Sequence, residues 1–131
     1  MSTAENSPHW SAHERAQPLR HSLSLPGSKS LTNRELVLAA LAEGPSTLRR
    51  PLHSRDTALM VEALRSLGAI ITEIPGEGAF GPDLATTPIP AGHNVSASID
   101  CGLAGTVMRF VPPLAALVTG TLRFDGDIGA R

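Results

Sequence analysis

The residues best suited to chemistry gather in one short turn, Pro26 to Ser30, which holds Lys29, the only lysine of the chain. Alternating apolar residues before the turn predict a strand, and a broad apolar face after it predicts a helix. The start of a helix offers an anion unpaired backbone N–H groups and the positive end of the helix dipole. Ser28 and Ser30 add hydroxyl donors, and Arg34 follows Ser30 by one helical turn on nearly the same side. These cations and hydroxyls could converge on a phosphate or carboxylate ligand.

A second glycine-bearing turn, Gly102 to Thr106, precedes another apolar stretch, and Arg109 lies in the first turns of the helix expected there. Taken alone, the turn around Lys29 is read more simply as a capped helix with solvated basic residues. It is not a nucleotide-binding P-loop, because Gly27 lacks a partner glycine at the required upstream spacing. Two such turns in one chain favour two helix N-termini that face a shared cleft, one for each anionic group of a substrate or substrate pair.

Other reactive residue types form no such pattern. The five histidines lack metal-ligand spacing with one another or with Cys101, so we expect no structural zinc site. The acidic residues show no pair set for general acid–base work, and Asp125 to Asp127 is typical of a turn rather than a calcium loop. A lone cysteine excludes an internal disulfide framework, and we expect Cys101 to be a small buried residue rather than a nucleophile.

The composition is that of an ordinary soluble domain. Its 131 residues are 41% hydrophobic and 18% charged, and the formal net charge of −1 excludes a generally basic surface for nucleic acid or an anionic membrane. No apolar run approaches the ~20 residues that span a bilayer. Residues 1–20 lack the apolar core of a secretory signal. A single cysteine permits a reducing, cytoplasmic setting.

The helices and strands that position the two turns are predicted from the periodicity of apolar residues and from the Gly- and Pro-rich breaks between them. Residues 1–20 show no periodicity and predict a flexible N-terminal arm, which leaves 21–131 as the ordered domain. Helices are expected at about 31–41, 55–67 and from 105 onward, the last bending or restarting at Pro112-Pro113. Strands are expected at 21–25, 46–48, 69–74, 95–99 and 122–124, with a hairpin connection at 75–92.

Capping residues refine the helix boundaries. Thr32 with Glu35 fits a capping box for the first helix, with Ser30 as the alternative cap. Gly44 should supply the left-handed stop of that helix, and Ser54 the N-cap of the second. Lys29 is thus expected at the entrance of the first helix.

Two similar segments indicate an internal duplication. Residues 38–44, Leu-Ala-Ala-Leu-Ala-Glu-Gly, are echoed by 114–120, Leu-Ala-Ala-Leu-Val-Thr-Gly, and each segment leads to Thr-Leu-Arg. Helices rich in Ala and Leu can resemble one another by chance, but the shared order of strand, turn, helix, stop and strand favours a repeated unit. The predicted fold class is α/β (α+β), with about one and a half units present.

Ordered motifs along the chain resemble the signatures of one enzyme family. Leu25 to Arg34 is very similar to the N-terminal signature of 3-phosphoshikimate 1-carboxyvinyltransferase (EPSP synthase), an enolpyruvyl transferase. Ser54 to Thr57 resembles the family's next helix, and Ala104 to Arg109 its second signature. Gly126 to Arg131 resembles the opening of a third, basic motif. Several motifs in the right order are far more specific than any one of them.

The resemblance implies roles for the first turn. Family members transfer the enolpyruvyl group of phosphoenolpyruvate to shikimate 3-phosphate, in the shikimate pathway to chorismate and the aromatic amino acids, and are the target of glyphosate. Lys29 would contact both substrates as the catalytic bridge between them. Ser30 and Arg34 would hold shikimate 3-phosphate.

The resemblance also implies roles for the second turn. Gly105 would let the backbone approach phosphoenolpyruvate closely, because glycine has no Cβ. Thr106 and Arg109 would shape and support that pocket. The chain departs from the family pattern at Leu103 and Phe110, where many members have Asn and Pro. The leucine removes an amide that could have made polar contacts there.

The family architecture also sets expectations for the whole protein. Family members have two lobes of repeated βαβαββ units that close over the substrates, and they use no metal or organic cofactor. Residues 21–131 would be an incomplete first lobe, with the general acid and base beyond Arg131. We therefore expect the fragment to be inactive alone and able to self-associate, and the full-length enzyme to be a cytoplasmic monomer without nucleic-acid or membrane partners.

Two alternatives stay open. A related transferase that acts on UDP-N-acetylglucosamine shares the architecture, but its turn typically reads Gly-Ala-Lys-Asn, so Ser28 and Ser30 argue against it. A non-catalytic phospho-ligand-binding module would use the same helix N-termini and would bind phosphate without a second lobe.

Overall fold

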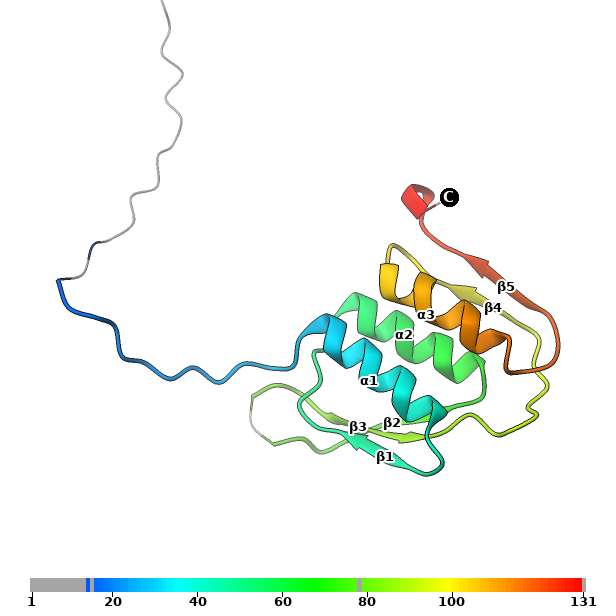
Figure 1. Cartoon of the computed structure of the whole chain (residues 1–131), viewed down its shortest axis with the longest axis horizontal. Coiled ribbons are helices and arrows are strands. Elements are labelled where there is room, and N and C mark those ends of the chain that lie inside the picture. The colour runs from blue at the N-terminus through cyan, green and yellow to red at the C-terminus, as the bar shows by residue number, and fades with distance from the viewer. Residues whose placement is uncertain (1–13, 15, 78, 131) are drawn as a thin grey trace, which may run out of the picture.

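Three α-helices form the centre of the fold. The computed structural model describes residues 14, 16–77 and 79–130. Within these residues, α1 (Lys29–Leu41), α2 (Arg55–Ser66) and α3 (Gly105–Ala115) lie side by side with their N-termini at the same end (Figure 1). None of the described helices is long and apolar enough to cross a membrane.

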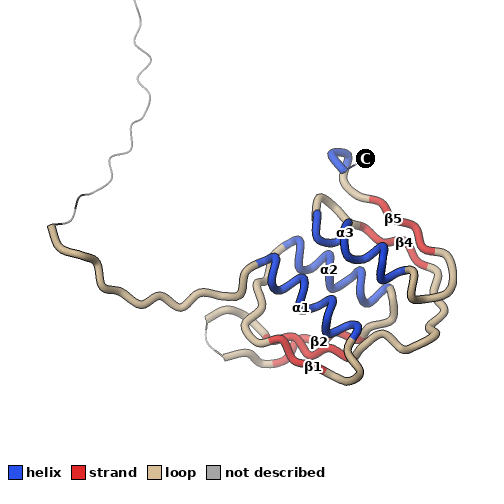
Figure 2. The backbone as a smooth tube through the Cα atoms, in the orientation of Figure 1, coloured by secondary structure: helices blue, strands red, loops and turns tan. Residues whose placement is uncertain are grey.

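Two small sheets flank the helices (Figure 2). β1 (Ser46–Leu48), β2 (Ile70–Ile74) and β3 (Asp83–Thr87) form an antiparallel sheet in the order β1-β3-β2. β4 (Ala97–Asp100) and β5 (Leu122–Asp125) form a parallel pair, and the 3₁₀ helix η1 (Ile128–Ala130) follows β5. The prediction of a mixed helix and sheet fold is confirmed. The predicted hairpin at 75–92 is also present, because β2 and β3 pair antiparallel on either side of its tip.

The start of α1 differs from the prediction. Ser28 is the N-cap, and its hydroxyl accepts a hydrogen bond from the backbone N–H of Leu31 at 3.2 Å. The predicted caps, Thr32 with Glu35 or Ser30, are wrong, because the hydroxyl of buried Thr32 instead accepts the backbone N–H of Leu52 at 3.0 Å. Lys29 is therefore the first helical residue.

The end of α1 also differs from the prediction. The helix stops at Leu41 with Ala42 in an extended conformation, so the left-handed stop predicted at Gly44 is wrong. The predicted strand at 21–25 is absent from the structure, since these described residues have no neighbouring strand to complete a ladder. The predicted arm at 1–20 lies mostly outside the described residues and stays a prediction.

The start of α2 confirms its predicted cap. The hydroxyl of Ser54 accepts the backbone N–H of Thr57 at 3.3 Å, and the hydroxyl of Thr57 accepts the backbone N–H of Ser54 at 2.7 Å. This reciprocal capping box fixes the N-terminus of the helix. After the helix, Gly68 takes a φ of 107°, which side chains rarely adopt, and turns the chain into β2.

α3 runs without interruption through Pro112 and Pro113 and ends at Ala115, so of the predicted bend or restart at this pair the restart is wrong. Most of the predicted second repeat copy, 114–120, consequently lies beyond the helix, whereas much of the first copy lies inside α1. The internal repeat stays a prediction.

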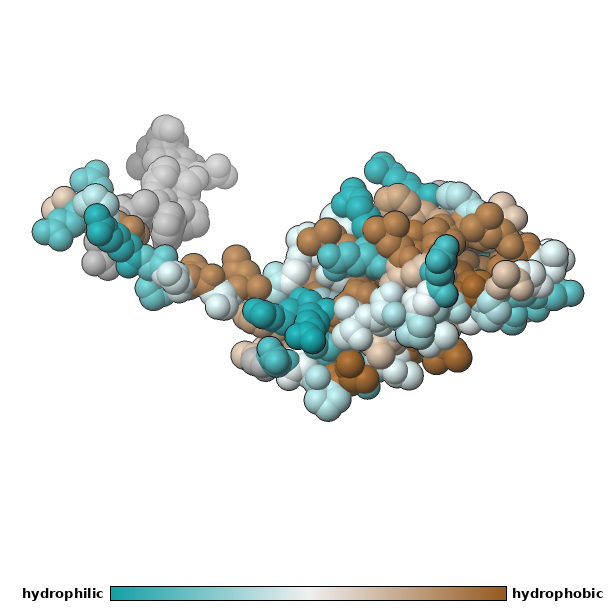
Figure 3. Space-filling view, turned by 60° about the horizontal axis from the view of Figure 1, so that its bottom comes forward, coloured by the Kyte–Doolittle hydropathy of each residue, from teal (hydrophilic) through white to brown (hydrophobic). Residues whose placement is uncertain are grey.

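The core lies between the helices and the sheets. Its largest fully buried apolar side chains are Leu36, Met60, Leu64, Leu67, Ile99, Val107 and Val111. The outer face of α1 is mixed, because Leu31, Leu38 and Leu41 are exposed on the same helix as the charged residues Arg34 and Glu35. Hydrophobic side chains gather over part of the folded unit in the space-filling view (Figure 3).

Candidate anion-binding site

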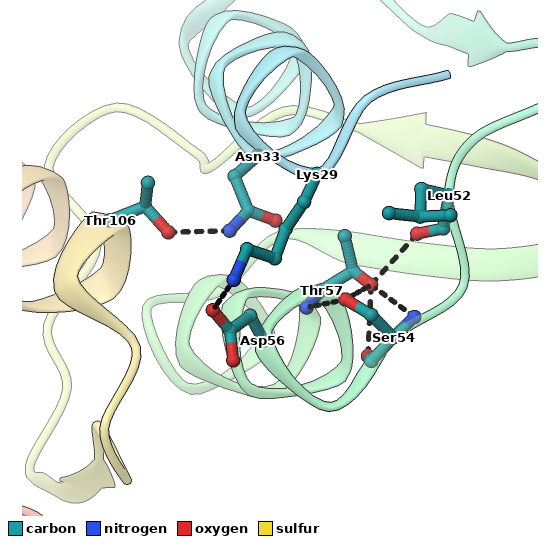
Figure 4. Close-up of polar contacts among 7 residues, drawn as sticks. All are labelled: Lys29, Asn33, Leu52, Ser54, Asp56, Thr57 and Thr106. Atoms are coloured by element: carbon teal, nitrogen blue, oxygen red, sulfur yellow. Dashed lines mark hydrogen bonds and ion pairs between the residues drawn. The ribbon is translucent and has the colours of Figure 1, made fainter. Parts of the chain in front are cut away.

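The N-termini of the three helices meet at one end of the fold (Figure 4). The ammonium of Lys29, at the start of α1, lies 2.8 Å from a carboxylate oxygen of Asp56, at the start of α2. The amide Nδ2 of Asn33 in α1 donates to the hydroxyl of Thr106, at the start of α3, at 2.5 Å. The structure thus brings together the two predicted helix starts and adds a third. Aligned helix N-termini present backbone N–H groups and partial positive charge to an anion.

Lys29 keeps access to solvent although it has a partner. Its side chain is 52% exposed, and that of Asp56 is 25% exposed. A half-exposed ion pair of this kind contributes at most about 1 kcal/mol, because water screens both charges. Asp56 also interacts favourably with the positive end of the α2 dipole. The ammonium can therefore bind a ligand from its open side while Asp56 holds it in place.

Ser30 and Arg34 lie on one side of α1, as their spacing predicts. The guanidinium Nη1 of Arg34 donates to the backbone carbonyl of Ser30 at 3.3 Å, and both residues are exposed. The guanidinium also lies over the ring of Phe110 from α3, 5.9 Å from the ring centroid. This cation–π contact places Arg34 against the middle of α3. Phe110, one of the two residues that depart from the family pattern, thus contacts the guanidinium of Arg34.

The start of α3 is open to a ligand. Its N-cap, Ala104, makes no side-chain capping hydrogen bond. A Cβ built on Gly105 would meet no atom within 4 Å, so packing inside this chain does not require glycine there. Arg109, one turn further, is exposed and makes no hydrogen bond or ion pair with the described residues.

An ion pair that sequence reasoning missed ties α2 to the chain after β5. The Nη2 atom of Arg55 donates to both carboxylate oxygens of Asp127, at 3.0 and 2.8 Å. This carboxylate raises the pKa of Arg55. The backbone N–H of Asp127 donates to the carbonyl of Gly102 at 3.2 Å. The turn before α3 is thereby held against the start of α2.

Two further residue types play no visible part at these helix starts. Cys101 is buried, as predicted, and burial together with Asp100 and Asp125 raises the pKa of its thiol. In the described part of the chain, His, Cys, Asp and Glu side chains nowhere gather in the groups of three that could hold a metal ion. The chemistry available at this end is the binding of anions by a lysine, arginines, hydroxyls and backbone N–H groups.

The fold and the helix N-termini at this end define an α/β unit with a candidate anion-binding site. The family model of EPSP synthase (3-phosphoshikimate 1-carboxyvinyltransferase) matches residues 13–131. A 3-phosphoshikimate 1-carboxyvinyltransferase of Kocuria rhizophila is 61% identical over 127 residues, which cover 93% of this chain and 28% of that protein. The chain belongs to the EPSP synthase family and spans 28% of the length of this curated relative.

Solved structures support the same fold. An EPSP synthase from Acinetobacter baumannii superposes with a TM-score of 0.61 at 22% identity, over 81% of this chain and 23% of that chain. A second structure of the A. baumannii enzyme gives a TM-score of 0.60 at 22% identity, over 83% of this chain and 24% of that chain. At this identity the likeness concerns the fold alone.

Proposed function

We propose that the whole protein to which this chain contributes transfers the enolpyruvyl group of phosphoenolpyruvate to shikimate 3-phosphate. The observation that carries the proposal is the position of Lys29 where three helix N-termini meet, in a chain that belongs to the EPSP synthase family. The Kocuria rhizophila relative is named for this reaction. Both proposed substrates carry phosphate and carboxylate groups, which is the chemistry that this end of the fold suits.

Lys29 is proposed to bridge the two substrates. Two like unit charges about 4 Å apart repel by about 4 kcal/mol at an effective dielectric of 20. A half-exposed ammonium between them offsets this repulsion and holds the reacting atoms in line. In the proposed reaction the 5-hydroxyl oxygen of shikimate 3-phosphate bonds to C2 of phosphoenolpyruvate, as the hydroxyl loses its proton and C3 gains one. Phosphate then leaves from the resulting tetrahedral intermediate, and the double bond re-forms as a proton is lost.

The other predicted residues divide between the substrates. Ser30 and Arg34 lie together on the exposed side of α1, which supports their proposed contact with shikimate 3-phosphate. Gly105 has open space beside its Cα, which supports a close approach of phosphoenolpyruvate to the uncapped start of α3. Thr106 and Arg109 lie on the same helix and would support that pocket. The general acid and base are proposed to come from another part of the whole protein.

Several broader expectations belong to the same proposal. The whole protein is proposed to be a cytoplasmic monomer that uses no cofactor and binds neither nucleic acid nor membrane. The 131-residue chain is proposed to be inactive alone, because a single open lobe does not exclude water or complete the charge clamp. The exposed leucines of α1 support self-association of the isolated chain.

A chimeric enzyme tests the proposal. Residues 13–131 would replace the matching N-terminal segment of the Kocuria rhizophila protein, and phosphate release would be measured with both substrates. We expect turnover in the unmutated chimera, a nearly complete loss in Lys29→Ala, and little change in Arg49→Ala, an exposed cation after β1. Wild-type turnover in Lys29→Ala would refute the bridging role. Competition with UDP-N-acetylglucosamine decides between the two acceptors.

A further inference from the structure

Asn33 is a buried polar residue beside the candidate site. Its side chain is fully buried at 0% exposure, among the largest buried side chains of the described chain. Its Nδ2 donates to the hydroxyl of Thr106 at 2.5 Å. Its Oδ1 has no hydrogen-bond partner among the described residues. The amide is therefore committed to one contact, which joins α1 to α3.

This contact connects the two helix starts to which ligand-binding roles are assigned. Asn33 lies one helical turn after Lys29 on the same face of α1, where residues four apart stack. Thr106 directly follows Gly105 at the start of α3. A shift of Thr106 along α1 would carry Gly105 with it. The Asn33 amide thus controls how far the open start of α3 lies from the ammonium of Lys29.

An apolar side chain at position 33 would pack, but it would not specify this register. Contacts such as those among Leu36, Val107 and Val111 are non-directional and tolerate sliding of one helix past another. A hydrogen bond fixes both distance and direction. The unpaired Oδ1 is unfavourable in a buried position, so the amide has no advantage over an apolar residue for folding alone. Its advantage is that it fixes the position of α3 relative to α1.

We infer that Asn33 is a positioning residue that, through Thr106, sets Gly105 at the start of α3 against Lys29 at the start of α1. The inference rests on the proposed function, because it assigns the α3 start to phosphoenolpyruvate. Asn33 is buried behind the site and acts through Thr106. Loss of the contact should therefore weaken phosphoenolpyruvate binding more than binding of shikimate 3-phosphate.

The test uses four variants of the chimera. Asn33→Leu removes the amide and keeps the number and branching of the side-chain heavy atoms, and Thr106→Val removes the hydroxyl isosterically. Thr106→Ser keeps the hydroxyl, and the fourth variant combines the first two. We expect Asn33→Leu and Thr106→Val each to raise the KM for phosphoenolpyruvate by about tenfold, since small misplacements at a site have large effects, with the KM for shikimate 3-phosphate within about twofold. Thr106→Ser, which keeps the hydroxyl, should raise the KM for phosphoenolpyruvate less than Thr106→Val, and the double variant should be no worse than either single one.

Thr86 supplies a matched control. It is buried, and its hydroxyl also lacks a partner among the described residues, but it lies on β3 in the antiparallel sheet. Thr86→Val should leave both KM values unchanged. An unchanged KM for phosphoenolpyruvate in a folded Asn33→Leu variant, or an equal rise in both KM values, would overturn the positioning role.

A second readout separates this inference from the proposed function. If the unmutated chimera does not turn over the two substrates, the proposed function fails, and the placement is then read from backbone amide resonances of the same protein. Asn33→Leu should shift the resonances of Gly105 and Thr106, whereas Thr86→Val should not. Resonances that stay in place in Asn33→Leu would overturn the inference whatever the enzyme does.

Discussion

The ammonium of Lys29 and the carboxylate of Asp56 lie 2.8 Å apart and join the first turn of α1 to the first turn of α2. The pair places a negative charge directly beside the cation proposed to bind anionic substrates. Because Lys29 is half exposed, Asp56 leaves part of its charge available to a ligand. The strength of anion binding at this end therefore depends on Asp56 as well as on the cations.

Neutralising Asp56 should strengthen anion binding at little cost in stability. In the chimera, Asp56→Asn removes the carboxylate that competes for Lys29, and we expect tighter binding of inorganic phosphate at low salt. The free energy of unfolding should fall by less than about 1 kcal/mol, because the pair is partly exposed. Calorimetric titration and urea unfolding measure the two effects. Glu62→Gln, further along α2, is the control and should leave phosphate binding unchanged; weaker binding in Asp56→Asn would contradict the prediction.

Alanine should destabilise the protein at Gly102 but not at Gly105. Gly102 has a φ of 49°, and a Cβ there would lie 2.7 Å from Cδ1 of Leu59 and 3.2 Å from Nη2 of Arg55. We expect Gly102→Ala to destabilise the protein by about 2 kcal/mol through strain and crowding. A Cβ on Gly105 meets nothing within 4 Å, so Gly105→Ala should fold normally.

Gly105→Ala also tests whether the start of α3 binds phosphoenolpyruvate. In the chimera, Gly105→Ala should raise the KM for phosphoenolpyruvate, because the added methyl group lies where the ligand is proposed to approach. Thermal unfolding checks the predicted stabilities of the two alanine variants, and steady-state kinetics checks the predicted KM. A wild-type KM in Gly105→Ala would remove the argument for a close approach of ligand at this glycine.

Two buried threonines should respond oppositely to valine. The Thr86 hydroxyl has no partner in the described chain, so Thr86→Val should raise the free energy of unfolding by about 1 kcal/mol. The Thr57 hydroxyl donates to the carbonyl of Leu52 at 2.8 Å and completes the capping box with Ser54. Thr57→Val should lower the free energy of unfolding by about 2 kcal/mol. Urea unfolding measures the free energy of unfolding of both variants. Equal changes in Thr86→Val and Thr57→Val would contradict the assignment of an unpaired hydroxyl to Thr86 and a paired one to Thr57.

The thiol of Cys101 should be unreactive in the folded protein. Burial, Asp100 and Asp125 raise its pKa, which keeps it protonated and poorly nucleophilic. We expect a thiol reagent to label the native protein far more slowly than the protein unfolded in guanidinium. Equal labelling rates would show that the side chain is open to solvent.

The raised pKa of Cys101 also predicts a pH dependence. The folded state binds the thiol proton more tightly than the unfolded state, so this contribution to stability is complete below the unfolded thiol pKa. It is lost as the pH rises through the folded pKa, which lies above the ordinary value of about 8.5. Stability should therefore fall less steeply with alkaline pH in Cys101→Ala than in the parent, and parallel curves would contradict the linkage.

Local patterns were sufficient for most of the elements and for the helix starts that carry the candidate site residues. The cap at Ser54, the glycine stop at Gly68 and the apolar periodicity of the helices depend on neighbours within a turn or two, so they can be read from the chain alone. The placement of Lys29 and Gly105 at helix starts followed from the same local signals. Residues 21–25 were the exception, since a strand exists only where a second strand pairs with it.

The sequence by itself determined which side chains could bind anions and that they stand at helix starts. Tertiary structure decided which other residues contact these side chains. Segments that are distant along the chain are joined by two ion pairs and a hydrogen bond. The ion pairs are Lys29–Asp56 and Arg55–Asp127, and the hydrogen bond runs from Asn33 to Thr106. No periodicity or spacing records such pairs, because they depend on how the helices pack rather than on any local preference.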